Sequence, residues 1–129
     1  MRIFKTKAKL SSYLSLNSKL STAFVPTMGA LHKGHLELVG KAKSQSDIVI
    51  CSIFVNPTQF DKKEDFNNYP HTLPNDLMQL EEINCDVVYT PAVSDLYGKN
   101  EKVKHYDFDG LDRVLEGKFR KGHFDGVVT

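Results

Sequence analysis

The sequence of 129 residues lacks tryptophan, has only two cysteines and contains no long apolar segment. Two cysteines do not form the disulfide framework of a small secreted domain, so we interpret them as small buried hydrophobes in a reducing compartment. The longest apolar run, residues 48–55, is far shorter than the about 20 residues of a membrane-spanning helix. The first residues become polar too soon for a signal peptide. We therefore expect a cytoplasmic location and no membrane partner.

An excess of one charge is also missing. The 17 basic and 16 acidic residues give a net charge of +1, so a nucleic-acid partner is not expected. What is present is typical of a globular protein, with 40% hydrophobic and 26% charged residues. The length fits a single domain of the usual ~100–200 residues. We predict that residues 1–129 form one domain.

Short β-branched runs alternate with helical periodicity along the chain. Such alternation predicts an α/β fold, a Rossmann-like parallel sheet with flanking helices, whose ligands bind beyond the carboxyl ends of the strands. Long polar segments, 56–74 and 117–124, are predicted loops. The predicted strands are 2–4, 23–25, 48–55, 86–89 and 103–108. The first predicted helix lies around residues 10–14 and ends near Asn17, and another helix opens at residues 74–76. The other predicted helices are 35–44, 91–97 and 110–116.

The segment 26–35, with the sequence PTMGALHKGH, lies between a predicted strand and a predicted helix. A glycine-containing turn at a helix N-terminus brings together backbone N–H groups that can bind phosphate. His32 and His35 are three residues apart, so both rings can face one anion. Gly29 and Gly34 provide a turn or close approach that a side chain would obstruct. Capping histidines are the alternative. A zinc site would need further ligands that the sequence does not cluster here, so no metal site is predicted.

Two amide side chains, Asn56 and Gln59, follow the predicted strand 48–55. Amides both donate and accept hydrogen bonds, which suits a substrate that carries hydroxyls and a carboxylate. Ordinary turn chemistry is the alternative, because Asn-Pro commonly starts a turn. Met28 could line a pocket or pack in the core.

The string PTMGALHKGHL, followed by SIFVNPTQF at 52–60, closely resembles the pantothenate synthetase family of the HxGH nucleotidyltransferase superfamily. The segments 69–72 (YPHT) and 122–127 (GHFDGV) agree with it. The resemblance covers the whole chain, although family members are considerably longer. It implies an amino-terminal nucleotide- and pantoate-binding domain that is incomplete at the carboxyl end of the chain and inactive alone, with the carboxyl-terminal domain beyond Thr129.

The resemblance also implies the chemistry. Pantoate condenses with β-alanine at the expense of ATP through a pantoyl-adenylate, with release of AMP and pyrophosphate, and Mg²⁺ accompanies the phosphates. A homodimer is expected, because strand 23–25 would leave one edge open unless 103–108 covers it. The implied catalytic residues are His35, the proton donor, and His32; the implied ATP-binding residues are Met28, Gly29, Ala30, Leu31, His32, Lys33, Gly34 and His35; the implied substrate-binding residues are Pro26, Met28, Asn56, Gln59 and Tyr69.

Some positions depart from the family pattern. His71 stands where arginine is usual, which exchanges a permanent charge for a titratable one. Asp125 replaces a residue that is often basic. The basic loop of Lys118, Arg120, Lys121 and His123 is either a solvated surface or a phosphate-facing lid. Two other functions stay open: a different HxGH nucleotidyltransferase, or a nucleotide-binding module without catalysis.

Overall fold

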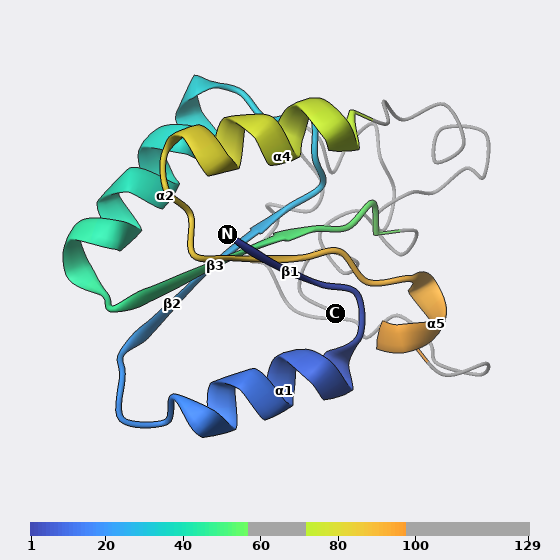
Figure 1. Cartoon of the computed structure of the whole chain (residues 1–129). Helices are drawn as coiled ribbons and strands as arrows, with labels where there is room; N and C mark the ends of the chain where they lie inside the picture. Colours follow the sequence, from blue (N-terminus) through green and yellow to red (C-terminus); the bar gives the residue numbers. More distant parts are fainter. Residues whose placement is uncertain (57–71, 98–129) are drawn as a thin grey trace, which may run out of the picture. The chain divides into compact units, whose positions relative to one another are not determined.

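A computed structural model of the chain describes residues 1–56 and 72–97 (Figure 1). By its contacts the chain divides into two compact units, Met1–Phe54 with Pro70–Tyr97, and Val55–Tyr69 with Gly98–Thr129. All described helices and strands belong to the first unit. The predicted elements 103–108, 110–116 and 117–124, and most of the predicted loop 56–74, lie outside the described residues.

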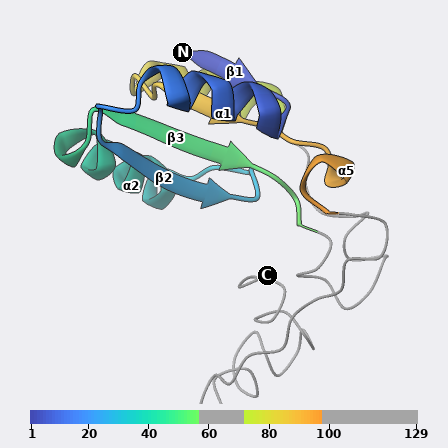
Figure 2. The same cartoon turned by 90° about the horizontal axis from the view of Figure 1, so that it is seen from below.

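The described strands form one parallel sheet, as the alternating pattern predicts. Its order is β1-β4-β3-β2, and all three strand pairings are parallel. Helices cover both faces: α2 and α4 lie on one side, and α1 lies on the other (Figures 1 and 2). This is the α/β Rossmann-like architecture. The strands are β1 (Arg2–Phe4), β2 (Thr22–Thr27), β3 (Ile48–Ile53) and β4 (Val87–Tyr89), and the helices are α1 (Lys7–Leu16), α2 (Lys33–Gln45), α4 (Leu73–Glu82) and α5 (Val93–Leu96).

The two faces of the sheet bury separate hydrophobic clusters. Alternate residues of β3 point to opposite faces, so Val49 and Cys51 join one cluster while Ile48 and Ile50 join the other. The first cluster includes Val39 of α2 and Leu80 of α4; the second packs against α1. Because both faces of β3 are covered, this strand is the continuous apolar run that the sequence shows.

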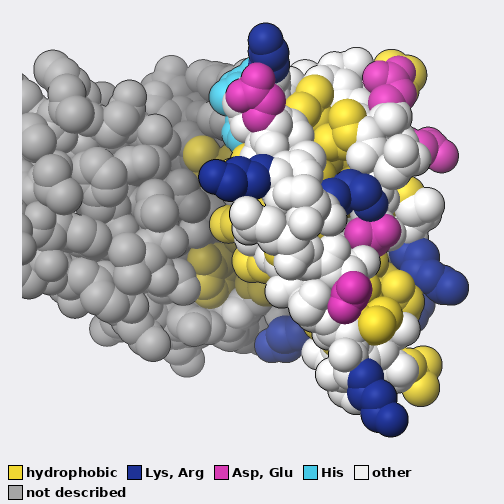
Figure 3. All heavy atoms as spheres, turned by 90° about the vertical axis from the view of Figure 1, so that its left-hand side faces the viewer, with side chains coloured by type: hydrophobic (Ala, Val, Ile, Leu, Met, Phe, Trp, Pro, Cys, Tyr) yellow, Lys and Arg dark blue, Asp and Glu magenta, His cyan; other side chains and the backbone are white. Residues whose placement is uncertain are grey.

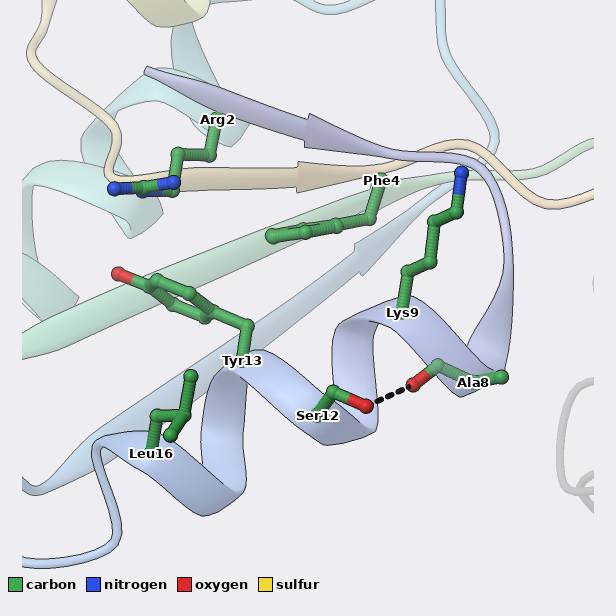
Figure 4. Close-up of a pocket in the computed structure, with 7 residues that line it drawn as sticks. All are labelled: Arg2, Phe4, Ala8, Lys9, Ser12, Tyr13 and Leu16. Carbon is green, nitrogen blue, oxygen red and sulfur yellow. Dashed lines mark hydrogen bonds between the residues drawn. The ribbon is translucent and has the colours of Figure 1, made fainter.

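Helix α1 packs against β1 through aromatic side chains (Figure 4). The rings of Phe4 and Tyr13 lie 5.3 Å apart between centroids, and the Arg2 guanidinium lies 5.2 Å from the centre of the Tyr13 ring. A shallow pocket remains between the two elements, lined also by Ala8, Lys9, Ser12 and Leu16. Most of the surface that lines this pocket is apolar.

Both cysteines behave as the sequence predicts. Cys51 and Cys85 are free and fully buried. Burial raises the pKa of the Cys51 thiol to about 12, and it raises the pKa of Cys85 as well. Such thiols stay protonated and inert near neutral pH.

Among the described residues there is no helix with the length and hydropathy needed to cross a membrane.

The predicted boundaries need small corrections. Strand β2 continues beyond the predicted 23–25, and β3 ends before the predicted Val55. Helix α2 begins at Lys33 rather than His35, because His32 caps it. Strand β2 pairs with β3, as predicted, and it is one of the two edge strands of the described sheet, with β1 at the other edge.

Candidate active site

The segment between β2 and α2 lies at the carboxyl end of the parallel sheet, where α/β proteins bind ligands. Within it the backbone turns sharply, with φ at +84° in Gly29 and +50° in Ala30. A left-handed conformation costs a non-glycine residue about 1–2 kcal/mol. A side chain at Gly29 would also place its Cβ 3.1 Å from Asp76 Oδ2 and 3.2 Å from Ile53 Cγ2. The turn is therefore strained, and other contacts must hold it.

Side-chain oxygens hold this turn by accepting its backbone N–H groups. Gly29 N–H donates to Thr27 Oγ1 at 3.2 Å. Ala30 N–H donates to Asp76 Oδ2 at 3.0 Å, and Leu31 N–H donates to Asp76 Oδ1 at 2.9 Å. Thr27 is itself fixed, since its hydroxyl donates to the backbone oxygen of Ser52 in β3.

The next residues form a reciprocal cap on α2. His32 is the N-cap residue, and its Nδ1 accepts from Gly34 N–H at 3.1 Å. In return, His32 N–H donates to Nδ1 of His35 at 3.1 Å. This arrangement is a capping box built from two histidines instead of the usual serine or threonine with glutamate. The ring centroids are 4.0 Å apart, with 38° between the planes.

The cap settles which nitrogen of each ring carries the proton. Since Nδ1 accepts a hydrogen bond in both His32 and His35, the neutral ring carries its hydrogen on Nε2. Burial lowers the pKa of His35, the neighbouring His32 lowers it further, and the Asp76 carboxylate opposes both. The His35 ring is therefore neutral at pH 7. In the described part of the chain Nε2 of neither ring has a hydrogen-bond partner, so the loop presents two Nε2–H donors.

This geometry corrects one detail of the sequence interpretation. The sequence predicts that backbone N–H groups of the turn bind phosphate, but those of Gly29, Ala30, Leu31, His32 and Gly34 already donate to protein acceptors. The two imidazoles are additional donors that an anion could meet, because their Nε2 atoms have no partner in the described part of the chain.

Gly34 is required for a related reason. A Cβ there would lie 2.9 Å from Cε1 and 3.1 Å from Nδ1 of the His32 ring. The close approach predicted for this glycine is real, but the group that approaches is the capping histidine.

The remaining predicted site residues are placed unevenly. Pro26 is exposed on β2 and Met28 is half-buried in the turn. Lys33 is exposed and lies 3.9 Å from Glu37 in a surface ion pair. Asn56, which follows β3, is buried with 7% of its surface exposed. Outside the described residues lie Gln59, Tyr69, His71, Lys118, Arg120, Lys121, His123 and Asp125.

The sequence interpretation missed Asp76 and Thr72. Asp76 is read from the sequence as an ordinary acidic residue in the first turn of α4, and its spacing from the turn at residues 29–31 carries no signal. Only the packing of α4 beside the loop brings them together. Thr27 is likewise inconspicuous in a strand.

The described part of the chain offers no metal site. It contains no group of three or more His, Cys, Asp or Glu side chains that could hold an ion. The buried carboxylate nearest the turn, Asp76, uses both oxygens to accept protein N–H groups. This part of the chain therefore does not fit a protein-bound Mg²⁺.

A parallel sheet with helices on both faces places the chain in the α/β Rossmann-like class of folds. The comparison with known families is specific within that class. The chain belongs to the pantoate–β-alanine ligase family, whose model matches residues 2–129. Figure 3 shows that histidine side chains of the described residues reach the molecular surface.

Relatives agree with this assignment. The pantothenate synthetase of Christiangramia forsetii is 47% identical over the whole chain, and that of Fervidobacterium nodosum is 49% identical. The chain spans about half the length of the curated relatives it matches, 47% and 46% in these two cases.

Solved structures show the same fold. The pantothenate synthetase of Thermus thermophilus superimposes with a TM-score of 0.88 at 39% identity, over 100% of this chain and 46% of that one. The pantoate–β-alanine ligase of Francisella tularensis gives 0.89 at 42% identity, over 99% and 49%. That protein was solved in complex with beta-gamma ATP and beta-alanine.

Proposed function

We propose that the protein joins pantoate to β-alanine at the expense of ATP, and that residues 1–129 belong to its amino-terminal nucleotide- and pantoate-binding domain. The observation that carries the proposal is the pair of imidazoles, each held at Nδ1 by the helix cap, at the carboxyl edge of a parallel sheet. Family membership supports it, as does the Francisella tularensis relative with beta-gamma ATP and beta-alanine.

The reaction proceeds in two steps. A carboxylate oxygen of pantoate attacks the α-phosphorus of ATP, the bond to the bridging oxygen breaks, and pyrophosphate leaves with that electron pair. The amine of β-alanine then attacks the acyl carbon, loses a proton, and AMP leaves with the acyl oxygen. Positioning of reactants and neutralisation of the charge on the leaving group provide most of the acceleration in such transfers.

The histidine loop contributes the second of these effects. The Nε2–H groups of His32 and His35 donate to phosphate oxygens as negative charge develops on pyrophosphate. Because the cap fixes both rings before ATP arrives, no reorganisation is needed in the transition state. The neutral His35 ring acts as a hydrogen-bond donor through Nε2–H. As the candidate proton donor to pyrophosphate that the family implies, it must first take up a proton, because only the imidazolium form can give one away.

The remaining roles are extrapolated from the family. ATP lies against Met28, Gly29, Ala30, Leu31, His32, Lys33, Gly34 and His35, and pantoate contacts Pro26, Met28, Asn56, Gln59 and Tyr69. Mg²⁺ enters on the ATP phosphates and is held by them and by water. A cytoplasmic location and a homodimer stay predictions; sedimentation at micromolar concentration tests the second, and a monomer would contradict it.

Isotope exchange separates this reaction from other nucleotidyl transfers. Radiolabelled pyrophosphate should enter ATP when pantoate is present and β-alanine is absent, because the first step is reversible. Addition of β-alanine should then produce AMP and pantothenate in equal amounts. Exchange without pantoate, or AMP release that ignores β-alanine, would contradict the proposal.

A further inference from the structure

Asp76 is the most deeply buried charged residue among those that the structure describes, with 1% of its surface exposed. A buried carboxylate is costly unless it is paired or fully hydrogen-bonded. No described cation forms an ion pair with it. Its charge is balanced instead by three donors: the N–H groups of Ala30 and Leu31, and the hydroxyl of Thr72 at 3.0 Å.

The contacts of Thr72 indicate independently that the start of α4 holds the β2–α2 turn. Thr72 is the N-cap residue of α4, yet its side chain makes no capping hydrogen bond to that helix. The hydroxyl instead donates to Asp76 and accepts from Ala30 N–H at 3.1 Å. Pro74, in the first turn of α4, has no N–H to offer a capping side chain, so the Thr72 hydroxyl is available for the β2–α2 turn. The first turn of α4 is thus directed at the β2–α2 turn.

The contacts fall on a strained part of the chain. Ala30 is the non-glycine residue in the left-handed region within this turn, and its N–H is held by both Thr72 and Asp76. Strain of this kind persists only where the surroundings over-determine it. The two residues that follow, Leu31 and His32, lead into the histidine cap, so the position of the clamp sets the position of both rings.

We propose that Asp76, assisted by Thr72, is a positioning residue that clamps the Ala30–Leu31 backbone and thereby places the His32 and His35 donors for ATP. The proposal rests on the proposed function only in naming ATP as the ligand. Asp76 touches the loop through the loop's backbone and spends both carboxylate oxygens there, so it acts through the loop and not on the nucleotide.

The test compares Asp76→Asn with Asp86→Asn, an identical chemical change at the other end of the sheet. Asp86 also accepts a backbone N–H, from Val49 at 2.9 Å, so its loss tests ordinary destabilisation. Asp76→Asn should weaken ATP binding, measured by calorimetry, by about tenfold or more, because the amide replaces one acceptor with a donor that faces Ala30 or Leu31. Asp86→Asn should lower the midpoint of unfolding and leave ATP affinity unchanged.

A second readout does not depend on ATP. In nucleotide-free protein, nitrogen NMR of the imidazoles reports the tautomer and the titration of His35. Asp76→Asn should lower the pKa of His35 further, because the carboxylate that raises it is gone. An unchanged His35 titration together with wild-type ATP affinity would overturn the proposal, and so would equal loss of ATP affinity in both aspartate variants.

Variants of Thr72 test the same proposal if Asp76→Asn does not fold. Thr72→Val removes the hydroxyl with little change of shape and should weaken ATP binding, whereas Thr72→Ser keeps the hydroxyl and should bind like the wild type. Equal affinities in these two variants would contradict the clamp. If the wild-type protein itself does not bind ATP, the proposed function fails, while the tautomer of His35 still decides whether Asp76 positions the loop, because the Nδ1-accepting form depends on the geometry of the cap.

Discussion

The two ends of the parallel sheet each carry an aspartate that accepts backbone N–H groups, and they use it differently. At the amino end, Asp86 accepts from Val49 and lies 3.4 Å from the Lys43 ammonium, with about a third of each side chain exposed. At the carboxyl end, Asp76 is buried, has no cation partner in the described part of the chain, and holds a left-handed turn.

This difference shows where the molecule accepts strain. The amino end is built for stability, since a half-exposed ion pair and one backbone hydrogen bond cost little and require no unusual conformation. The carboxyl end combines a buried charge with a left-handed alanine, and each of these costs stability. Costs of this kind gather at functional sites.

The largest expected effect is on the rate of the reaction, which should depend on the carboxyl end of the sheet and not on the amino end. His35→Ala should lower the rate of pantothenate formation by about 10²–10³-fold, or about 2.7–4 kcal/mol of barrier, because it removes a preorganised donor. Lys43→Ala, at the amino end, should leave that rate unchanged. The rate is measured by coupled AMP release with all three substrates saturating, in the whole protein, because residues 1–129 are expected to be inactive alone.

A further variant divides the two roles of His35. In His35→Gln the amide oxygen can still accept from His32 N–H, as in an ordinary capping box. The imidazole Nε2–H at its fixed position is lost, and the amide N–H₂ that replaces it lies at a different place. The rate should therefore fall as in His35→Ala while the free energy of unfolding stays closer to the wild type. Recovery of the rate in His35→Gln would mean that the cap, and not the ring, is what catalysis needs.

Two glycines of α2 sharpen the comparison within one helix. Gly34→Ala should force the His32 ring out of its cap, because the new Cβ would lie 2.9 Å from ring Cε1, and ATP affinity should fall. Gly40→Ala meets nothing within 4 Å and should stabilise the protein by about 0.5–1 kcal/mol. Calorimetry and chemical denaturation measure the two quantities. Equal ATP affinity in both variants would show that the ring position does not matter.

The smallest expected effect concerns pH. The pKa of His35 is lowered in the folded protein, so folding favours the neutral ring that accepts at Nδ1. The stability from this cap is fully present above the unfolded value of about 6.5 and is lost as pH falls through the folded pKa. Its size should be about 0.5–2 kcal/mol, as for other caps. Denaturation at pH 7.5 and 5.5 measures it, and His35→Gln should show less of this dependence.

Much of the fold could be predicted from local patterns. The β-branched run that starts at Ile48 indicates a strand covered on both faces, and the structure buries it on both. The segment 26–35 also stands out locally, because glycines and histidines at fixed spacing follow a strand. The first residue of the helix that follows, α2, could not be predicted correctly, because serine and threonine are the expected N-cap residues and here a histidine takes that role.

The site was predicted less completely. His32 and His35 were recognised as candidates, but the tautomer that makes them Nε2–H donors follows from hydrogen bonds that no spacing encodes. The roles given to Gln59 and Tyr69 stay predictions, since both lie outside the described residues.

By itself the sequence determined the α/β class, the order of the described elements, the buried cysteines and the identity of the histidine loop, because hydrophobic periodicity and short motifs are local properties of the chain. Only the tertiary structure decided which donors face outward and what holds them. Asp76 and the Ala30–Leu31 turn lie 45 or more residues apart, and they meet because α4 packs on the same face of the sheet as α2. A contact of that kind depends on how distant elements pack, which no local pattern records.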